Sequence, residues 1–200
     1  MKLAHASLEP LHPDHAEELL VAASDPNIWS FMPNAMPDSV DAMRDWIEMR
    51  VGGSPDDPCF VAGSEQFAFL VRDGEGAAAG STSLYALDRR QKRAEVGWTW
   101  YGTRWHGTLL NKACKRLILG WAFDPPESGG LGLRRIQMKC DGRNARSFHA
   151  MAALGAVHEG TLRRHDKMWD GHIRDAELFS ITDLEWPAVR DRLDARLRQG

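Results

Sequence analysis

The chain has 200 residues, of which 43% are hydrophobic and 26% charged, which is typical of a globular protein of one domain. Its formal net charge of -3 lacks the positive excess that a nucleic acid partner requires, and no run approaches the ~20 apolar residues of a membrane span. The three cysteines, Cys59, Cys114 and Cys140, form no CxxC pair, so we expect reduced thiols and a cytoplasmic protein.

The N-terminal third predicts one strand followed by two helices. The strand is expected near residues 5–9, and Pro13 suits the first position of the first helix. The second helix has Asp38 or Ser39 as its cap and ends in the turn 52–55. Both helices have apolar residues at helical spacing: Ala16, Leu19, Leu20 and Ala23 in the first, and Val40, Met43, Ile47 and Val51 in the second.

From Phe67 to Tyr101 the apolar residues alternate with polar ones, which predicts three successive strands. The turn residues 73–76 and the charged stretch 88–93 separate these strands, so antiparallel hairpins are the economical connection.

The C-terminal half predicts a helix from Asn111, a strand over 134–140, a helix over 144–154 that Gly155 ends, and strands over 157–162 and 176–181. The amphipathic segment 186–197 fits packing on the sheet or on a partner chain, a second copy in a homodimer included. This order predicts a single α/β (α+β) domain over residues 1–200. Its central sheet would be mixed, mostly antiparallel, with about seven strands, flanked by four helices plus a C-terminal helix.

The segment from Glu95 to Lys112 is a strand, a loop with Gly107 and the start of a helix. Amide groups without partners in the first turn of a helix bind anions, so a pyrophosphate fits here, and Lys112 adds positive charge. The alternative is that Gly107 only makes a turn and Asn111 only caps the helix.

Three blocks of sequence carry a family resemblance. They are residues 94–98 leading into 105–112, residues 139–147 followed by Leu154-Gly155-Ala156 and Glu159-Gly160, and residues 170–175 through Glu185-Trp186. Together they resemble the GNAT superfamily of N-acetyltransferases, in particular its RimJ/RimL-like branch of ribosomal-protein alanine acetyltransferases. The resemblance implies the GNAT fold and transfer of an acetyl group from acetyl-CoA to a primary amine, of a protein N-terminus or of a small molecule, by direct attack in a ternary complex.

The same resemblance implies the residues that bind the cofactor. Asn144 matches a residue that bonds the pantetheine arm, although a plain helix cap is an alternative that can coexist with this role. The other implied cofactor-binding residues are the backbone of Trp100 and Tyr101 and the loop residues His106, Gly107, Thr108, Leu109, Leu110, Asn111 and Lys112.

Two catalytic residues are expected. A primary amine is mostly protonated at pH 7, so a carboxylate is needed nearby, and Glu95 is our choice, with Glu159 and Asp175 in reserve. The alternative for Glu95 is a surface carboxylate paired with Arg93. Ser147 would hydrogen-bond or protonate the departing thiolate, or else is an ordinary helix-surface serine.

The chain departs from the family pattern at two positions. Met151 stands where many members have a tyrosine, and Leu109 stands where a glycine is expected, so its side chain could crowd the phosphates or forbid a positive φ. These departures motivate a second hypothesis, an acyl-CoA-binding GNAT-fold protein with little or no transferase activity that acts as a binding or interaction module.

The acceptor pocket is expected in the loop between the first two helices, where Phe31 and Met32 would give the amine an apolar surround; the alternative is that they belong to the core. No metal is expected. The histidines His158, His165 and His172 fall seven residues apart, which places them on alternating faces of strands.

Overall fold

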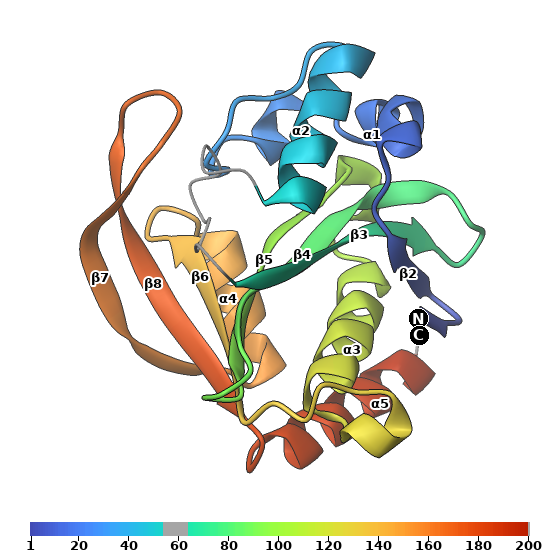
Figure 1. The fold of residues 1–200 in the computed structure, drawn as a ribbon, viewed down its shortest axis with the longest axis vertical. Helices are drawn as coiled ribbons and strands as arrows, with labels where there is room; N and C mark the ends of the chain where they lie inside the picture. Colours follow the sequence, from blue (N-terminus) through green and yellow to red (C-terminus); the bar gives the residue numbers. More distant parts are fainter. Residues whose placement is uncertain (54–63, 200) are drawn as a thin grey trace.

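A computed structural model describes residues 1–53 and 64–199 of the protein and shows one eight-stranded sheet with helices on both faces (Figure 1). The strands are β1 (Lys2–Leu3), β2 (Ala6–Pro10), β3 (Glu65–Asp73), β4 (Ala78–Asp88), β5 (Arg93–Tyr101), β6 (Arg135–Asp141), β7 (Val157–Lys167) and β8 (Ile173–Thr182). The helices are α1 (Ala16–Ala22), α2 (Val40–Gly52), α3 (Leu110–Phe123), α4 (Ala145–Leu154) and α5 (Trp186–Gln199).

The strand order is β1-β2-β3-β4-β5-β6-β8-β7, and β5 with β6 is the parallel pair in an otherwise antiparallel sheet. The predicted fold class, a mixed and mostly antiparallel sheet with flanking helices, is therefore confirmed. The additional strand is β1, whose two residues are too few to show a period in the sequence. Ser39 caps α2, since its Oγ accepts from the amide of Ala42 at 3.1 Å. Cys59 and the end of the predicted 52–55 turn lie outside the described residues.

Two hydrophobic cores lie on opposite faces of the sheet. Helices α3, α4 and α5 cover one face, and α1 and α2 cover the other, as Figure 1 shows. The C-terminal helix α5 packs within the chain, because Trp186, Val189 and Leu193 are buried in the same core as α3. The segment 186–197 was predicted to pack on the sheet or on a partner chain. In the described residues, it packs on the chain's own core.

Strand β5 changes face partway along its length. Ala94 and Val96 join the core under α3, whereas Trp98 and Trp100 join the core under α1 and α2. The ladder to β4 shifts between Ser81 and Ser83, and Trp98 has a φ of 51° there, as in a β-bulge. The residues of β5 before the bulge, Glu95 among them, and those after Trp98 therefore pair with β4 in different registers.

Strands β5 and β6 pair over only a short distance. Their register runs from Arg93 opposite Arg135 to Glu95 opposite Gln137, and in the described part of the chain no further pair follows. The backbone of β5 from Val96 to Tyr101 therefore has no partner on the β6 side, and the two strands diverge. Such a split in a sheet leaves backbone donors and acceptors free for a ligand.

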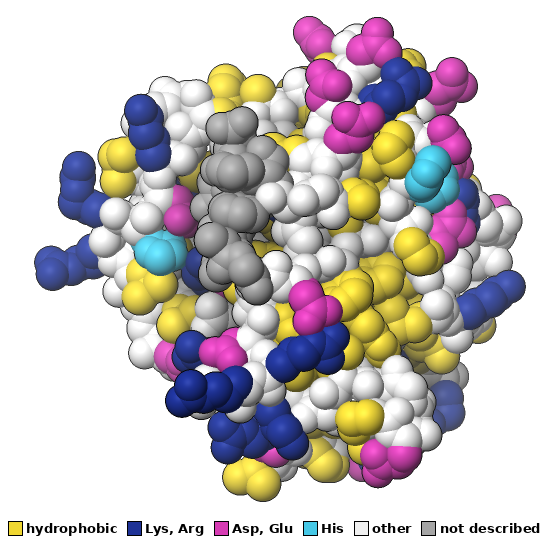
Figure 2. Space-filling model, viewed as in Figure 1, with side chains coloured by type: hydrophobic (Ala, Val, Ile, Leu, Met, Phe, Trp, Pro, Cys, Tyr) yellow, Lys and Arg dark blue, Asp and Glu magenta, His cyan; other side chains and the backbone are white. Residues whose placement is uncertain are grey.

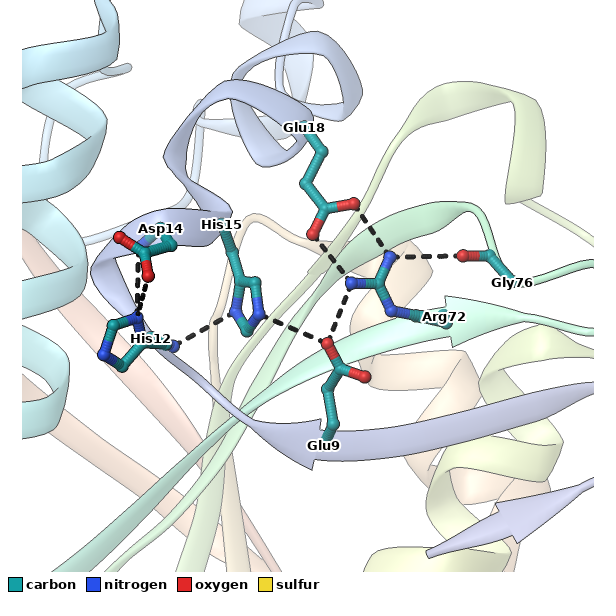
Figure 3. Close-up of polar contacts among 7 residues, drawn as sticks. All are labelled: Glu9, His12, Asp14, His15, Glu18, Arg72 and Gly76. Atoms are coloured by element: carbon teal, nitrogen blue, oxygen red, sulfur yellow. Dashed lines mark hydrogen bonds and ion pairs between the residues drawn. The ribbon is translucent and has the colours of Figure 1, made fainter.

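The β7–β8 hairpin projects from the sheet at the left of Figure 1, and Figure 2 shows Lys and Arg side chains standing out from it. Arg163, Arg164 and Lys167 on β7 are exposed. On the opposite side, an ion-pair cluster ties β2, α1 and β3 together: Arg72 binds both Glu9 and Glu18 (Figure 3). None of the described helices has the length and apolar character that crossing a membrane would need.

Candidate active site

A cavity of about 400 Å³ occupies the split between β5 and β6. Its walls come mainly from β5, the start of α3, the end of β6, helix α4 and the connection between α1 and α2. Glu95, Tyr101, Asn144 and Phe31, which lie far apart in the sequence, all line it. A cavity of this size and mixed lining is typical of a small-molecule or cofactor site.

The loop before α3 offers a row of amide donors. Among the described residues, no protein acceptor binds the backbone N–H groups of Gly107, Leu109, Asn111 and Lys112, whereas the N–H of Leu110 donates to Thr108 Oγ1 at 3.3 Å. Gly107 has a φ of 78°, the left-handed conformation that glycine adopts without strain. Free donors at the positive end of a helix dipole form an anion site, so these residues fit a pyrophosphate.

Leu109 does not strain this loop. Its φ is -74° and its ψ is -11°, so the position requires no positive φ and no glycine. Leu110 is buried in the core, and Thr108, Leu109 and Leu110 do not line the cavity with their side chains. Of the predicted loop residues, His106, Gly107, Asn111 and Lys112 do line it.

His106 is held as a neutral imidazole. Burial, followed by the nearby Arg146 guanidinium, lowers the pKa of His106 below its usual 6.5. Arg146 donates to His106 Nδ1 at 2.8 Å, so Nε2 carries the proton and donates to the Tyr101 carbonyl oxygen at 3.0 Å. The carbonyl of Tyr101 is therefore already engaged, while its hydroxyl donates to Asn111 Oδ1 at 3.2 Å.

Glu95 is buried, with 3% of its surface exposed, and lines the cavity. The Tyr85 hydroxyl donates to its Oε1, Gln137 donates to Oε2 at 2.8 Å, and the Lys139 ammonium lies 3.4 Å from Oε2. The alternative of a surface carboxylate paired with Arg93 is wrong, since Arg93 pairs with Asp88 at 3.4 Å. A Cβ at position 97 would come within 2.9 Å of the Tyr85 hydroxyl that holds Glu95, so a larger residue there would displace this hydroxyl.

The reserve carboxylates lie outside the cavity. Glu159 forms a bidentate pair with Arg135 and accepts from Ser180, and these two contacts lower its pKa to about 2. Asp175 accepts from the amide of Arg164 at 2.7 Å on the exposed hairpin. Neither carboxylate lines the cavity, so Glu95 is the better-placed candidate base.

Asn144 and Ser147 lie together where α4 begins. Asn144 Oδ1 accepts from the Ser147 amide at 3.0 Å, so the predicted helix cap is present and the NH₂ group of Asn144 has no described protein partner. Burial raises the pKa of Cys140 to about 11, although a hydrogen bond with the Ser147 side chain opposes the rise. Ser147, Cys140 and Met151 all line the cavity.

The opposite wall is aromatic and apolar. Phe31 and Met32 line the cavity, and Met32 is also buried in the core under α1 and α2. The Trp100 ring packs 5.3 Å from Trp29 and 6.1 Å from Trp46 between ring centroids. The Trp100 side chain is therefore structural, and its backbone is the part that a ligand can reach.

Lys115, Cys140 and Asp141 are among the cavity residues that sequence reasoning missed. Burial acts to raise the pKa of Asp141, but hydrogen bonds from Arg143 outweigh it and the pKa is lowered. Lys115 could have been found, because it lies four residues after Asn111 and so on the same helix face. Cys140 and Asp141 are the last two residues of β6, and they line the cavity because β6 diverges from β5 before this point.

A cluster outside the cavity has the spacing of metal ligands: Glu9, His15 and Glu18. Figure 3 shows that the Arg72 guanidinium occupies it, with Nη2 2.8 Å from Glu9 Oε1 and 2.8 Å from Glu18 Oε1. A bound cation would have to displace this guanidinium. The cluster is an ion-pair network between elements.

The family model of the GNAT acetyltransferase domain matches residues 6–157, and the chain belongs to this family. These proteins use acetyl-CoA, and the chain is an acetyl-CoA-dependent N-acetyltransferase by class.

One relative and two solved structures resemble nearly the whole chain. The uncharacterized N-acetyltransferase p20 of Bacillus licheniformis is 24% identical over 90% of this chain and 94% of its own length. A solved structure from T. thermophilus with a provisional acetyltransferase name is 33% identical, covers 98% of this chain and 96% of its own, and has a TM-score of 0.84. Mycobacterium smegmatis RimJ in complex with CoA-disulfide shares the fold, at 20% identity, a TM-score of 0.77, and coverage of 96% of this chain and 90% of its own.

Proposed function

We propose that this protein transfers the acetyl group of acetyl-CoA to a primary amine inside the cavity between β5 and β6. The observation that carries the proposal is the split itself: it joins a free β5 backbone, the open amide row before α3 and a buried carboxylate in one cavity. Acetyl-CoA supplies the activated thioester. The residues of the chain would bind and orient acetyl-CoA and transfer the protons.

The cofactor residues of the proposal have distinct tasks. The amides of Gly107, Leu109, Asn111 and Lys112 would bind the pyrophosphate, with the Lys112 and Arg146 side chains close by in the same wall. The free NH₂ group of Asn144 would donate to the pantetheine arm. The stretch of β5 from Val96 to Tyr101, Trp100 included, has no described partner on its β6 side and would bond the same arm along the split.

Glu95 would receive the proton of the amine, directly or through one water molecule. This role is supported by the buried position of the carboxylate in the cavity wall and by the three donors around it, which would fix its orientation. The neutral amine would then add to the thioester carbonyl, after which the thiolate would leave and take up the second amine proton, giving the amide and free CoA. A free N–H of β5 would stabilise the oxyanion, and Ser147 would hydrogen-bond the departing thiolate.

The acceptor would enter past Phe31 and Met32, on the face of the sheet covered by α1 and α2. This wall is apolar, so the proposal favours an amine with an apolar neighbour group, either on a small molecule or at a peptide N-terminus. The RimJ/RimL-like assignment of the sequence belongs to the same proposal, supported by the fold shared with RimJ.

The test is thiol release from acetyl-CoA with a panel of peptide N-terminal amines, amino acids, polyamines and small apolar amines. With the best acceptor, we predict that Glu95→Gln lowers kcat/KM by about 100-fold or more, because general-base catalysis contributes about that much. The matched control is Glu17→Gln, an exposed carboxylate on α1 that lies outside the cavity.

Two results would contradict the proposal. An unchanged kcat/KM for Glu95→Gln would show that Glu95 is not the general base. Binding of acetyl-CoA without thiol release for any amine would favour the second hypothesis, an acyl-CoA-binding module.

A further inference from the structure

Lys115 is a cation in the cavity wall without a carboxylate partner among the described residues. Its Nζ donates to Thr99 Oγ1 at 3.2 Å, and Thr99 Oγ1 in turn lies 2.7 Å from Thr82 Oγ1. The two carboxylates that line the cavity are engaged elsewhere, Glu95 with Lys139 and Asp141 with Arg143.

An ammonium group has three N–H donors, and lysines in buried surroundings are normally paired. Lys115 has one acceptor in the described part of the chain, so two donor directions are left for a ligand. Burial lowers the pKa of Lys115, because the ammonium loses hydration, and the neighbouring Cys114 only partly opposes this shift. A ligand that brings an oxygen acceptor into the cavity would restore the missing contact.

The position of Lys115 indicates which part of a ligand it meets. The bulge at Trp98 places Thr99 on the α3 side of β5, whereas Trp98 and Trp100 face α1 and α2. Helical side chains lean toward the helix N-terminus, so Lys115 leans toward the amide row at 107–112. Its amine therefore lies between the phosphate site and the free edge of β5.

We propose that Lys115 is a cofactor-binding residue whose amine donates to an amide oxygen of the pantetheine arm of acetyl-CoA. This inference rests on the proposed function, since it requires the cofactor to lie in the split. The phosphates have their own donors in the loop amides, Lys112 and Arg146, whereas Thr99 anchors Lys115 beside the strand that the arm would follow.

The test is calorimetric titration of CoA into wild type, Lys115→Met, Lys115→Arg and the control Lys167→Met. Methionine keeps the apolar stem and removes the donor; Lys167 is an exposed lysine on β7, outside the cavity. We expect Lys115→Met to raise Kd by about tenfold or more, Lys115→Arg to recover part of the affinity, and the control to match wild type. Melting temperatures without ligand should be similar for all four proteins.

The salt dependence of Kd distinguishes a contact of Lys115 with the pantetheine arm from one with the phosphates. A contact with a neutral amide oxygen predicts that the ratio of Kd values between Lys115→Met and wild type stays constant from about 0.05 M to about 0.5 M salt, because screening acts on charge pairs. A ratio that collapses toward one at high salt would place Lys115 on a phosphate instead and overturn the proposal.

Two further results would overturn it. One is an affinity of Lys115→Met within twofold of wild type. The other is a lowered melting temperature together with no recovery in Lys115→Arg, which would make the role structural. If wild type itself binds no CoA at millimolar concentration, the proposed function fails, and that result is distinct from a loss confined to the Lys115 variants.

Discussion

The Asn144 side chain has an oxygen that accepts from the Ser147 amide and an NH₂ group that faces the cavity without a described protein partner. The oxygen caps α4, and the NH₂ group is the part available to a cofactor. Sequence reasoning left the cap and the cofactor role as alternatives, and only the cap is visible in the fold. Substitution can separate the two.

We predict that Asn144→Asp keeps the cap but weakens CoA binding by about tenfold, because the donor is lost and a negative charge is introduced. Asn144→Ala should weaken binding and also lower the stability by about 1 kcal/mol through loss of the cap. Calorimetric titration and urea unfolding measure the two effects.

The matched control is Ser39→Ala, which removes the cap of α2, outside the cavity. It should reproduce the loss of stability without the loss of affinity. Wild-type affinity in Asn144→Asp would remove Asn144 from the cofactor site.

Glu95 illustrates what a sequence predicts about a residue and what it omits. Its place at the start of a strand before an anion-binding loop identifies it as a candidate base. Its partners Tyr85, Gln137 and Lys139 come from two other strands, β4 and β6, and only the register of the sheet brings them together. For the same reason the sequence offered Arg93 as a partner, a neighbour in the chain but not in space.

At the scale of elements, the loop before α3 is the least typical part of the sequence and an ordinary part of the structure. Leu109 has helical φ and ψ angles. Its backbone N–H has no described protein acceptor, and its side chain does not line the cavity. The expected conflict with a positive φ therefore does not arise at this residue. The sequence alone could not predict the backbone angles of Leu109.

We accordingly predict that Leu109→Gly changes the affinity for CoA by less than about threefold, since the φ of -74° and ψ of -11° at this position are angles that leucine adopts without strain. Calorimetric titration checks this, with Gly107→Ala as the contrasting variant. Gly107 has a φ of 78°, so alanine there should strain the loop and weaken binding. A tenfold gain of affinity in Leu109→Gly would show instead that the leucine crowds the phosphates.

At the scale of the whole molecule, periodicity and turn residues were sufficient to predict the helices, the hairpins and the mixed sheet. The split between β5 and β6 has no signature in the sequence, because no local pattern marks where two distant strands stop pairing. Contacts between remote elements, such as Arg72 with Glu9 and Glu18, likewise lie beyond local patterns.

The Arg72 cluster gives a prediction on stability and pH. The hydrogen bond from Arg72 is the main cause that lowers the pKa of Glu9 below its usual 4.5. A lowered carboxyl pKa in the folded state means that the contribution is complete above about pH 4.5 and is lost as the pH falls through the lowered value.

Arg72→Met should therefore lower the free energy of unfolding by roughly 1 kcal/mol at pH 7, and the difference from wild type should shrink below pH 4.5. Urea unfolding at several pH values measures it, with the exposed Arg90→Met as the control. A difference that stays constant down to acid pH would show that the guanidinium acts through packing rather than charge.

The cavity between β5 and β6 as the site of acetyl-CoA is the claim on which the other inferences depend. Calorimetric titration of acetyl-CoA into the wild-type protein tests it most directly. We predict binding of one molecule per chain with a dissociation constant of roughly 1 μM to 1 mM, the range in which enzymes normally bind their substrates. No heat of binding at millimolar acetyl-CoA would contradict the claim.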